Sequence, residues 1–203
     1  MAKAKRDLPV IAFKSQRAWD AWLTSQPAQS KGLWLKLAKK SSGIASVSKA
    51  EALDTALCHG WIDGQLDSFD DDYWLIRFTP RQSTSKWSEK NRTRALWLVE
   101  LRRMRPAGLT EIERAKNDGR WSAAYAPQST AQVPDDLRAA LAKNKQAKSF
   151  FETLDGTNRY AILHRTHDAK KPETRKARIE RYVMMLAEGK TIYPLKRKPQ
   201  KRA

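Results

Sequence analysis

Three stretches of this sequence combine side chains that suit the binding of an anionic or planar small molecule. They are residues 56–64, 78–81 and 85–88. An arginine presents a fork of N–H donors, an aspartate accepts hydrogen bonds, and indole rings form flat walls, which together favour a ligand pocket. The residues predicted to bind the ligand are Trp61, Asp63, Arg77, Arg81, Ser85, Trp87 and Asn91.

A hairpin is expected to position these side chains. Residues 61–66 and 73–78 alternate as strands do, and the aspartate-rich segment between them favours a turn. The alternation predicts that Trp61, Asp63 and Arg77 share the face away from the core. On the core face it places Ile62 and Leu66 of the first strand and Trp74, Ile76 and Phe78 of the second.

The same residues have a structural alternative. An ion pair between Asp63 and an arginine would lock the hairpin to the following helix, with Trp87 as packing. A further alternative is a hydrolase or transferase acting in a cleft between Asp63 and Arg81. The sequence leaves these interpretations open and assigns no catalytic residue.

The other reactive side chains favour structural roles. Cys58 and His59 are neighbours in a predicted helix and therefore do not face each other. Cys58 is expected to be a small buried residue, and His59 to cover the end of the helix. His164 and His167 have helical spacing but lack a third metal ligand. We expect no metal and no cofactor, since no glycine pattern of a nucleotide site is present either.

The sequence predicts an α+β protein: a small, mostly antiparallel sheet with helices in the amino-terminal half and an all-helical carboxy-terminal half. Ser48 and Glu51 have the spacing of a capping box, and Gly60 suits the end of that helix. The predicted domains are residues 8–130 and 131–190, followed by a mobile basic tail at 191–203. Later helices are predicted at 88–104, 108–118, 134–143, 146–154, 157–167 and 173–188.

The net charge of +18 is concentrated after residue 80, where 29 Lys/Arg stand against 13 Asp/Glu. This indicates either a solvated basic surface or an anionic partner, with sequence-independent nucleic-acid binding as the alternative function. The residues assigned to it are Arg92, Arg94, Arg102, Arg103, Arg105, Lys170, Lys171, Arg175 and Arg178. The helix at 88–104 is apolar on more than one face, which predicts either a central position or self-association.

The hydrophobic content of 40% and eight tryptophans indicate a folded protein. No apolar run reaches the roughly 18 residues of a transmembrane helix. The single cysteine fits a reducing compartment, so a cytoplasmic location is expected.

The motifs Gly60-Trp61-Ile62-Asp63-Gly64 and Phe78-Thr79-Pro80-Arg81, in this order, resemble the YdeI/OmpD-associated family of bacterial proteins, also described as bacteriocin-protection proteins. The segments 85–91, 104–108 and 118–121 extend the resemblance. Residues 134–137 and 169–179 are similar to the helical module of that family. The resemblance covers nearly the whole chain, from Phe13 to Gly189.

The resemblance implies a bacterial cytoplasmic protein of stress tolerance or bacteriocin protection that binds a ligand or partner. It implies no known reaction and no catalytic residues. The chain departs from the pattern where the family has a Gly-Arg pair before Met104, because it has Arg102-Arg103. It also has Trp97 in place of a polar residue. Both departures add charge or aromatic surface, which favours a partner specific to this protein.

Overall fold

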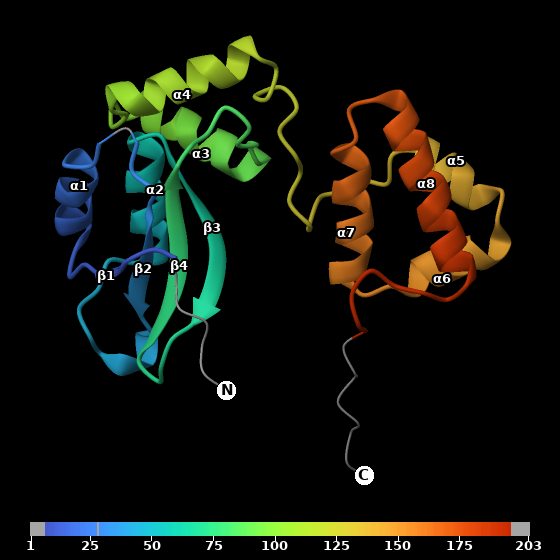
Figure 1. The fold of residues 1–203 in the computed structure, drawn as a ribbon, viewed down its shortest axis with the longest axis horizontal. Helices are drawn as coiled ribbons and strands as arrows, with labels where there is room; N and C mark the ends of the chain where they lie inside the picture. The colour runs from blue at the N-terminus through green and yellow to red at the C-terminus, as the bar shows by residue number, and fades with distance from the viewer. Residues whose placement is uncertain (1–6, 28, 196–203) are drawn as a thin grey trace. The chain divides into compact units, whose positions relative to one another are not determined.

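The computed structural model describes residues 7–27 and 29–195 of the 203-residue chain. It contains helices and a mixed sheet, which confirms the α+β class. The chain divides into two compact units, one ending at Ala124 and the other beginning at Tyr125 (Figure 1). Most of the predicted basic tail, residues 196–203, lies outside the described residues.

The sheet of the first unit consists of β1 (Val10–Ala12), β2 (Leu33–Ala38), β3 (Trp61–Ser68) and β4 (Tyr73–Pro80). Their order across the sheet is β1-β2-β4-β3. β1 is parallel to β2, and the other two neighbouring pairs are antiparallel. The predicted hairpin of β3 and β4 is therefore confirmed, and Asp70 stabilises its turn by accepting hydrogen bonds from the Asp72 and Tyr73 amides.

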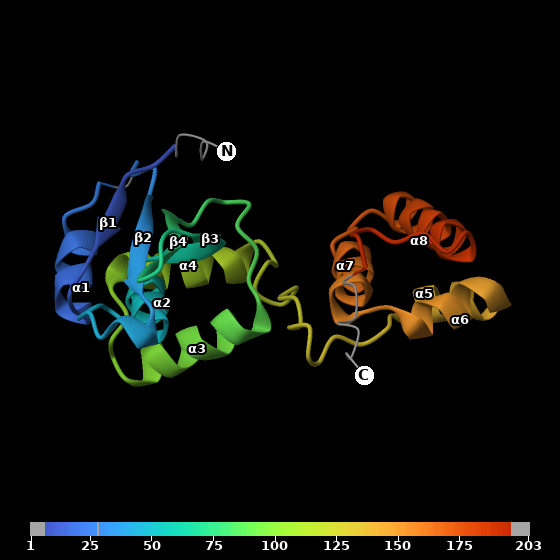
Figure 2. The same ribbon diagram turned by 90° about the horizontal axis from the view of Figure 1, so that it is seen from below.

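Helices α1 (Gln16–Thr24) and α2 (Lys49–Cys58) cover one face of this sheet (Figure 2). The indole N–H of Trp19 donates to the carbonyl oxygen of Ala52 at 3.0 Å, and this buried bond fixes the two helices side by side. Ser48 and Glu51 form the predicted capping box. Gly60, with φ 75°, then turns the chain from α2 into β3. A short 3₁₀ helix, η1 (Lys40–Ser42), lies between β2 and α2.

The faces of the hairpin differ from the prediction because β3 contains a bulge. Asp63 pairs with Phe78 and Leu66 pairs with Ile76, so β3 has one more residue than β4 between these pairs. An extra residue reverses the alternation along a strand. The prediction that Ile62 and Leu66 share the core face is therefore wrong.

The predicted shared face of Trp61, Asp63 and Arg77 is also wrong. Trp61 is buried in the core, edge-on to Trp22 with ring centroids 5.7 Å apart. Asp63 lies opposite Phe78 and so belongs to the same side of the sheet. Arg77 belongs to the opposite side, where it forms an ion pair with Asp7 at 3.1 Å. Around it, that side is closed by a small cluster of Leu8, Trp34, Phe69 and Leu75.

Helices α3 (Glu89–Glu100) and α4 (Pro106–Asn117) complete the first unit and share a second core with α2. The helix predicted to run to residue 104 ends at Glu100. Arg102 has a φ of 53°, and the amides of Arg102 and Arg103 donate to carbonyls of the last turn at 2.9 and 3.0 Å. This is the hydrogen-bond pattern of a Schellman motif, which ends a helix.

The second unit consists of α5 (Asp135–Ala142), α6 (Lys145–Thr153), α7 (Gly156–His167) and α8 (Pro172–Ala187) around one apolar core. Each bound lies within one residue of the prediction. Among residues 7–27 and 29–195, no helix has the length and apolar character that a membrane crossing requires.

Candidate functional site

The residues predicted to bind a ligand are distributed between packing and loop contacts. Trp87 is 2% exposed. Its ring meets that of Trp121 edge-on, with the ring centroids 4.8 Å apart. The buried guanidinium of Arg81 lies 3.5 Å from the Trp87 ring centroid and donates to the Lys86 carbonyl at 3.3 Å. Trp87 therefore acts as packing, as in the structural alternative. No ion pair joins Asp63 to Arg81 in the described part of the chain.

Ser85 and Asn91 also have local roles. The Ser85 hydroxyl accepts from the Gln82 amide, and its carbonyl accepts from Arg120 at 2.7 Å. The amide of Asn91 is capped by Ser88 at the start of α3. Ligand binding by the seven residues remains a prediction, but the common face on which it depended is not formed.

Several arginines assigned to nucleic acid are used within the fold. Arg94 makes two hydrogen bonds to the buried Asp54. Arg92 donates to the Trp121 carbonyl. In the second unit, Arg175 bonds Asp136 and Arg178 donates to the Arg165 carbonyl, whereas Lys170 and Lys171 are exposed. Nucleic-acid binding by these groups remains a prediction.

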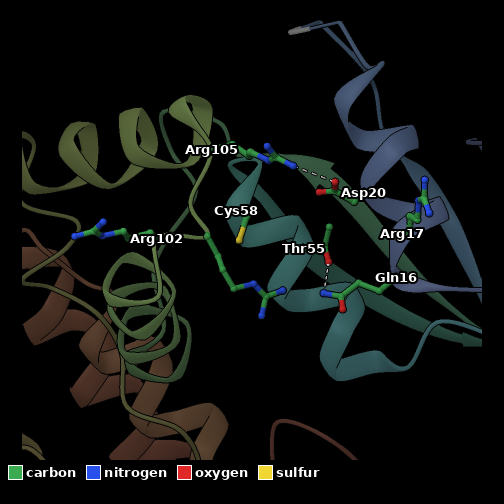
Figure 3. A pocket seen from close by; sticks show the side chains of 8 residues that line it. Gln16, Arg17, Asp20, Thr55, Cys58, Arg102 and Arg105 are labelled. Carbon is green, nitrogen blue, oxygen red and sulfur yellow. Dashed lines mark hydrogen bonds and ion pairs between the residues drawn. The ribbon is translucent and has the colours of Figure 1, made fainter.

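The remaining three, Arg102, Arg103 and Arg105, lie in the loop between α3 and α4 rather than on the helix. There they line a pocket of about 460 Å³. Figure 3 shows that Arg17 and Asp20 reach it from α1, and that Thr55 and Cys58 reach it from α2. In the described part of the chain, the lining consists of Gln16, Arg17, Asp20, Thr55, Cys58, Arg102, Arg103 and Arg105.

Asp20 is the carboxylate of this pocket, and it is already paired. It lies 2.8 Å from Nε2 of His59 and accepts a hydrogen bond from Arg105 at 3.1 Å. Burial raises the pKa of the Asp20 carboxyl, but the hydrogen bonds and charges of His59 and Arg105 outweigh it and lower the pKa below its usual value. The prediction that His59 covers the end of α2 is confirmed.

The other three arginines of the pocket have no partner among residues 7–27 and 29–195. The guanidinium groups of Arg17, Arg102 and Arg103 make no hydrogen bond, ion pair or ring contact there. Every other arginine of the described chain makes at least one. The described arginines that the fold does not use are therefore concentrated around one pocket.

Arg102 stands at a backbone position that favours glycine. A side chain in the left-handed region costs on the order of 1–3 kcal/mol unless its surroundings compensate. Among the described residues, Arg102 is the one residue other than glycine that has a positive φ. Its side chain extends outward from the rim, away from Cys58 (Figure 3). An arginine at this position therefore combines backbone strain with a positive charge.

Cys58 lies at the inner end of the pocket but is not activated. It is 4% exposed. Burial raises the pKa of its thiol, although Arg103 and Arg105 act in the opposite direction. A nucleophilic cysteine needs a lowered pKa. The Cys58 thiol therefore forms part of the pocket wall and is not a reactive group. The prediction of a small buried residue is confirmed.

This arrangement suits the binding of a small oxyanion. Guanidinium groups bind carboxylate and phosphate groups through paired N–H donors. Gln16, which donates to the Thr55 hydroxyl at 3.0 Å, adds neutral polar groups to one wall. The described residues of the pocket contain no activated nucleophile beside a base, so binding is the chemistry that the geometry supports best.

Sequence reasoning missed the contribution of α1 to this site. Gln16, Arg17 and Asp20 are more than 80 positions from the loop, and nothing in their local pattern connects them to it. The clustered arginines before Pro106 were a usable signal. The prediction that they share a helix face fails because α3 ends at Glu100, and no glycine marks this end in the sequence.

Comparison with protein families gives two matches. Residues 130–189 match the family described as "Bacteriocin-protection, YdeI or OmpD-Associated". Residues 11–111 match a domain of unknown function (DUF8412), and this range contains the Gly-Trp-Ile-Asp-Gly and Phe-Thr-Pro-Arg motifs. Comparison with curated proteins and with solved structures gives no match.

Proposed function

Because this chain carries a domain of the bacteriocin-protection, YdeI or OmpD-associated family at residues 130–189, we propose that it acts in bacteriocin protection and does so as a binding protein. Its ligand is a small molecule with a phosphate or carboxylate group, held in the arginine-lined pocket of the first unit. The observation that carries this proposal is the concentration of Arg17, Arg102 and Arg103, three arginines without a partner in the described chain, around one cavity.

The charges in the pocket favour an anion. Asp20 is balanced by Arg105, so the three other arginines give the lining its excess of positive charge. Exposed charges of this kind attract an anion at low ionic strength and are screened by salt. A cavity of about 460 Å³ is of the size that holds small metabolites.

Calorimetric titration of the full chain with inorganic pyrophosphate and with citrate tests the binding. We expect at least one of them to bind, and its affinity to fall at least about tenfold in Arg17→Ala/Arg103→Ala. Arg138→Ala is the matched control, because Arg138 is an exposed arginine of the second unit paired with Asp135. Equal affinity in all three proteins, or no binding of either anion at low salt, would contradict the proposal.

A killing assay tests the cellular role. Cells lacking the gene should be killed at a lower bacteriocin concentration than the parent strain. The wild-type gene and Arg138→Ala should restore tolerance, whereas Arg17→Ala/Arg103→Ala should not. Full restoration of tolerance by the double variant would show that protection does not depend on the arginine-lined pocket.

A further inference from the structure

A second pocket, of about 410 Å³, lies in the second unit and has an aromatic lining. Tyr125, Tyr160, Tyr193 and His164 supply the rings, and Gln128 and Thr157 supply neutral polar groups. Among residues 7–27 and 29–195, no lysine, arginine, aspartate or glutamate lines it. This composition differs from that of the arginine-lined pocket and requires a different ligand chemistry.

The aromatic walls are held in fixed positions. The Tyr160 hydroxyl donates to the Ala126 carbonyl at 2.9 Å. The ring of Tyr125 meets that of His164 at 80°, with centroids 4.8 Å apart, and Tyr160 meets His164 at 53°. Neither contact is parallel, so these rings form an angled surface rather than a flat slot.

Tyr193 is positioned at the pocket by a buried amide. Asn158 is 1% exposed, and its side chain accepts from the Tyr193 amide at 2.9 Å and donates to the Tyr193 carbonyl at 3.1 Å. Arg165 donates to the Tyr193 hydroxyl at 3.2 Å. The tyrosine itself is 44% exposed. The buried Asn158 therefore fixes the backbone of Tyr193, and Arg165 bonds the hydroxyl of its exposed ring, which is the preorganisation that a binding site needs.

Gln128 lies close to the start of α7, where Gly156 has no side chain to obstruct it. A Cβ atom at Gly156 would lie 2.4 Å from Nε2 of Gln128. The amide can donate and accept hydrogen bonds, and the Thr157 hydroxyl can do both as well. Neutral donors and acceptors thus stand beside the angled rings.

We propose that this pocket binds a pyranose sugar. The C–H faces of a pyranose pack on tyrosine rings, and its hydroxyl groups match the amide of Gln128 and the hydroxyl of Thr157. A cation is disfavoured, because no carboxylate lines the pocket and the Arg165 guanidinium contacts Tyr193. The described residues of the lining offer an inorganic anion no lysine or arginine, and the neighbouring Arg165 is already bonded to the Tyr193 hydroxyl. The angles between the rings disfavour a flat base.

The test is a ¹H–¹⁵N NMR titration of the full chain with N-acetylglucosamine and glucose, with uridine and choline as competitors of other chemistry. A sugar should shift the resonances of Gln128, Thr157 and Tyr193. The shifts should saturate at millimolar sugar, which corresponds to a binding free energy on the order of −3 to −4 kcal/mol. Tyr193→Ala and Gln128→Ala should each weaken the affinity at least several-fold. Met184→Ala is the control, since Met184 is 65% exposed and does not line the pocket.

Two results would overturn this proposal: no shift at these residues up to about 50 mM of either sugar, or equal affinity in Tyr193→Ala. Uridine or choline binding here in preference to both sugars would replace the sugar by another ligand. Because the pocket lies in the other unit, none of these results bears on the arginine-lined pocket.

Discussion

The backbone amide of Arg105 donates a hydrogen bond to the carbonyl oxygen of Cys58 over 3.0 Å. This bond satisfies a carbonyl of the last turn of α2, which has no partner within its own helix. It also fixes the loop between α3 and α4 at the inner end of the arginine-lined pocket. The site therefore depends on how closely this loop and α4 approach α2.

Gly108 should be required for that approach. A Cβ atom there would lie 2.3 Å from the Cys58 carbonyl oxygen and 2.8 Å from that of Leu57. Because backbone atoms cannot rotate away, we expect Gly108→Ala to lower the free energy of unfolding by about 2 kcal/mol or more. Urea denaturation measures this. Gly64→Ala, where the nearest atom is 3.7 Å away, is the control and should cost much less.

The arginine at position 102 should lower the stability of the fold while adding positive charge at the pocket. Arg102→Gly removes the strain at φ 53°, so we expect it to raise the free energy of unfolding by about 1 kcal/mol while weakening anion binding. Arg103→Gly is the matched control, because Arg103 lacks a positive φ and should lose about 0.5–1 kcal/mol. A destabilised Arg102→Gly would show that contacts of the arginine outweigh its strain.

Asp20 should stabilise the fold above acid pH. Its pKa is lower in the folded chain than in the unfolded chain, so its contribution is fully present above the unfolded pKa, near 3.9, and is lost as pH falls through the folded value. Asp20→Asn should therefore reduce stability at pH 7, and the difference from wild type should vanish at strongly acid pH. Urea denaturation between pH 7 and strongly acid pH measures this difference in the free energy of unfolding, with Asp71→Asn as an exposed control. A difference independent of pH would contradict the role of the charge.

Cys58 should react slowly with thiol reagents. The thiol is 4% exposed and its pKa is raised, so both access and thiolate fraction are low at pH 7. We expect maleimide labelling to be at least about 100-fold slower in the folded chain than in urea. Pyrophosphate, where it binds, should slow it further, because Cys58 lines the pocket. Rapid labelling of the folded chain would contradict the structure of the site.

Local chemistry predicted much of the fold. The capping box of Ser48 and Glu51 and the turn at Asp70 depend on residues close in sequence, and both were found. Strict alternation does not predict the bulge in β3, although a glycine inside a strand, here Gly64, is its typical signal. One extra residue moved Trp61 into the core and separated it from Arg77.

The arginine-lined pocket could not be predicted from the sequence, for a different reason. Arg17 meets the loop only because Trp19 fixes α1 beside α2, and such contacts over long sequence separations have no local pattern. The added charge at Arg102-Arg103 was visible in the sequence. Its position at the rim of a pocket depended on the helix ending at Glu100.

The most direct test of the anion site is a crystal structure of the chain soaked in tungstate, a tetrahedral dianion located by its anomalous scattering. The proposal predicts a tungstate peak within hydrogen-bond distance of the guanidinium groups of Arg17 and Arg103, and no peak there in Arg17→Ala/Arg103→Ala. A pocket without tungstate in wild-type crystals that bind it elsewhere would contradict the account.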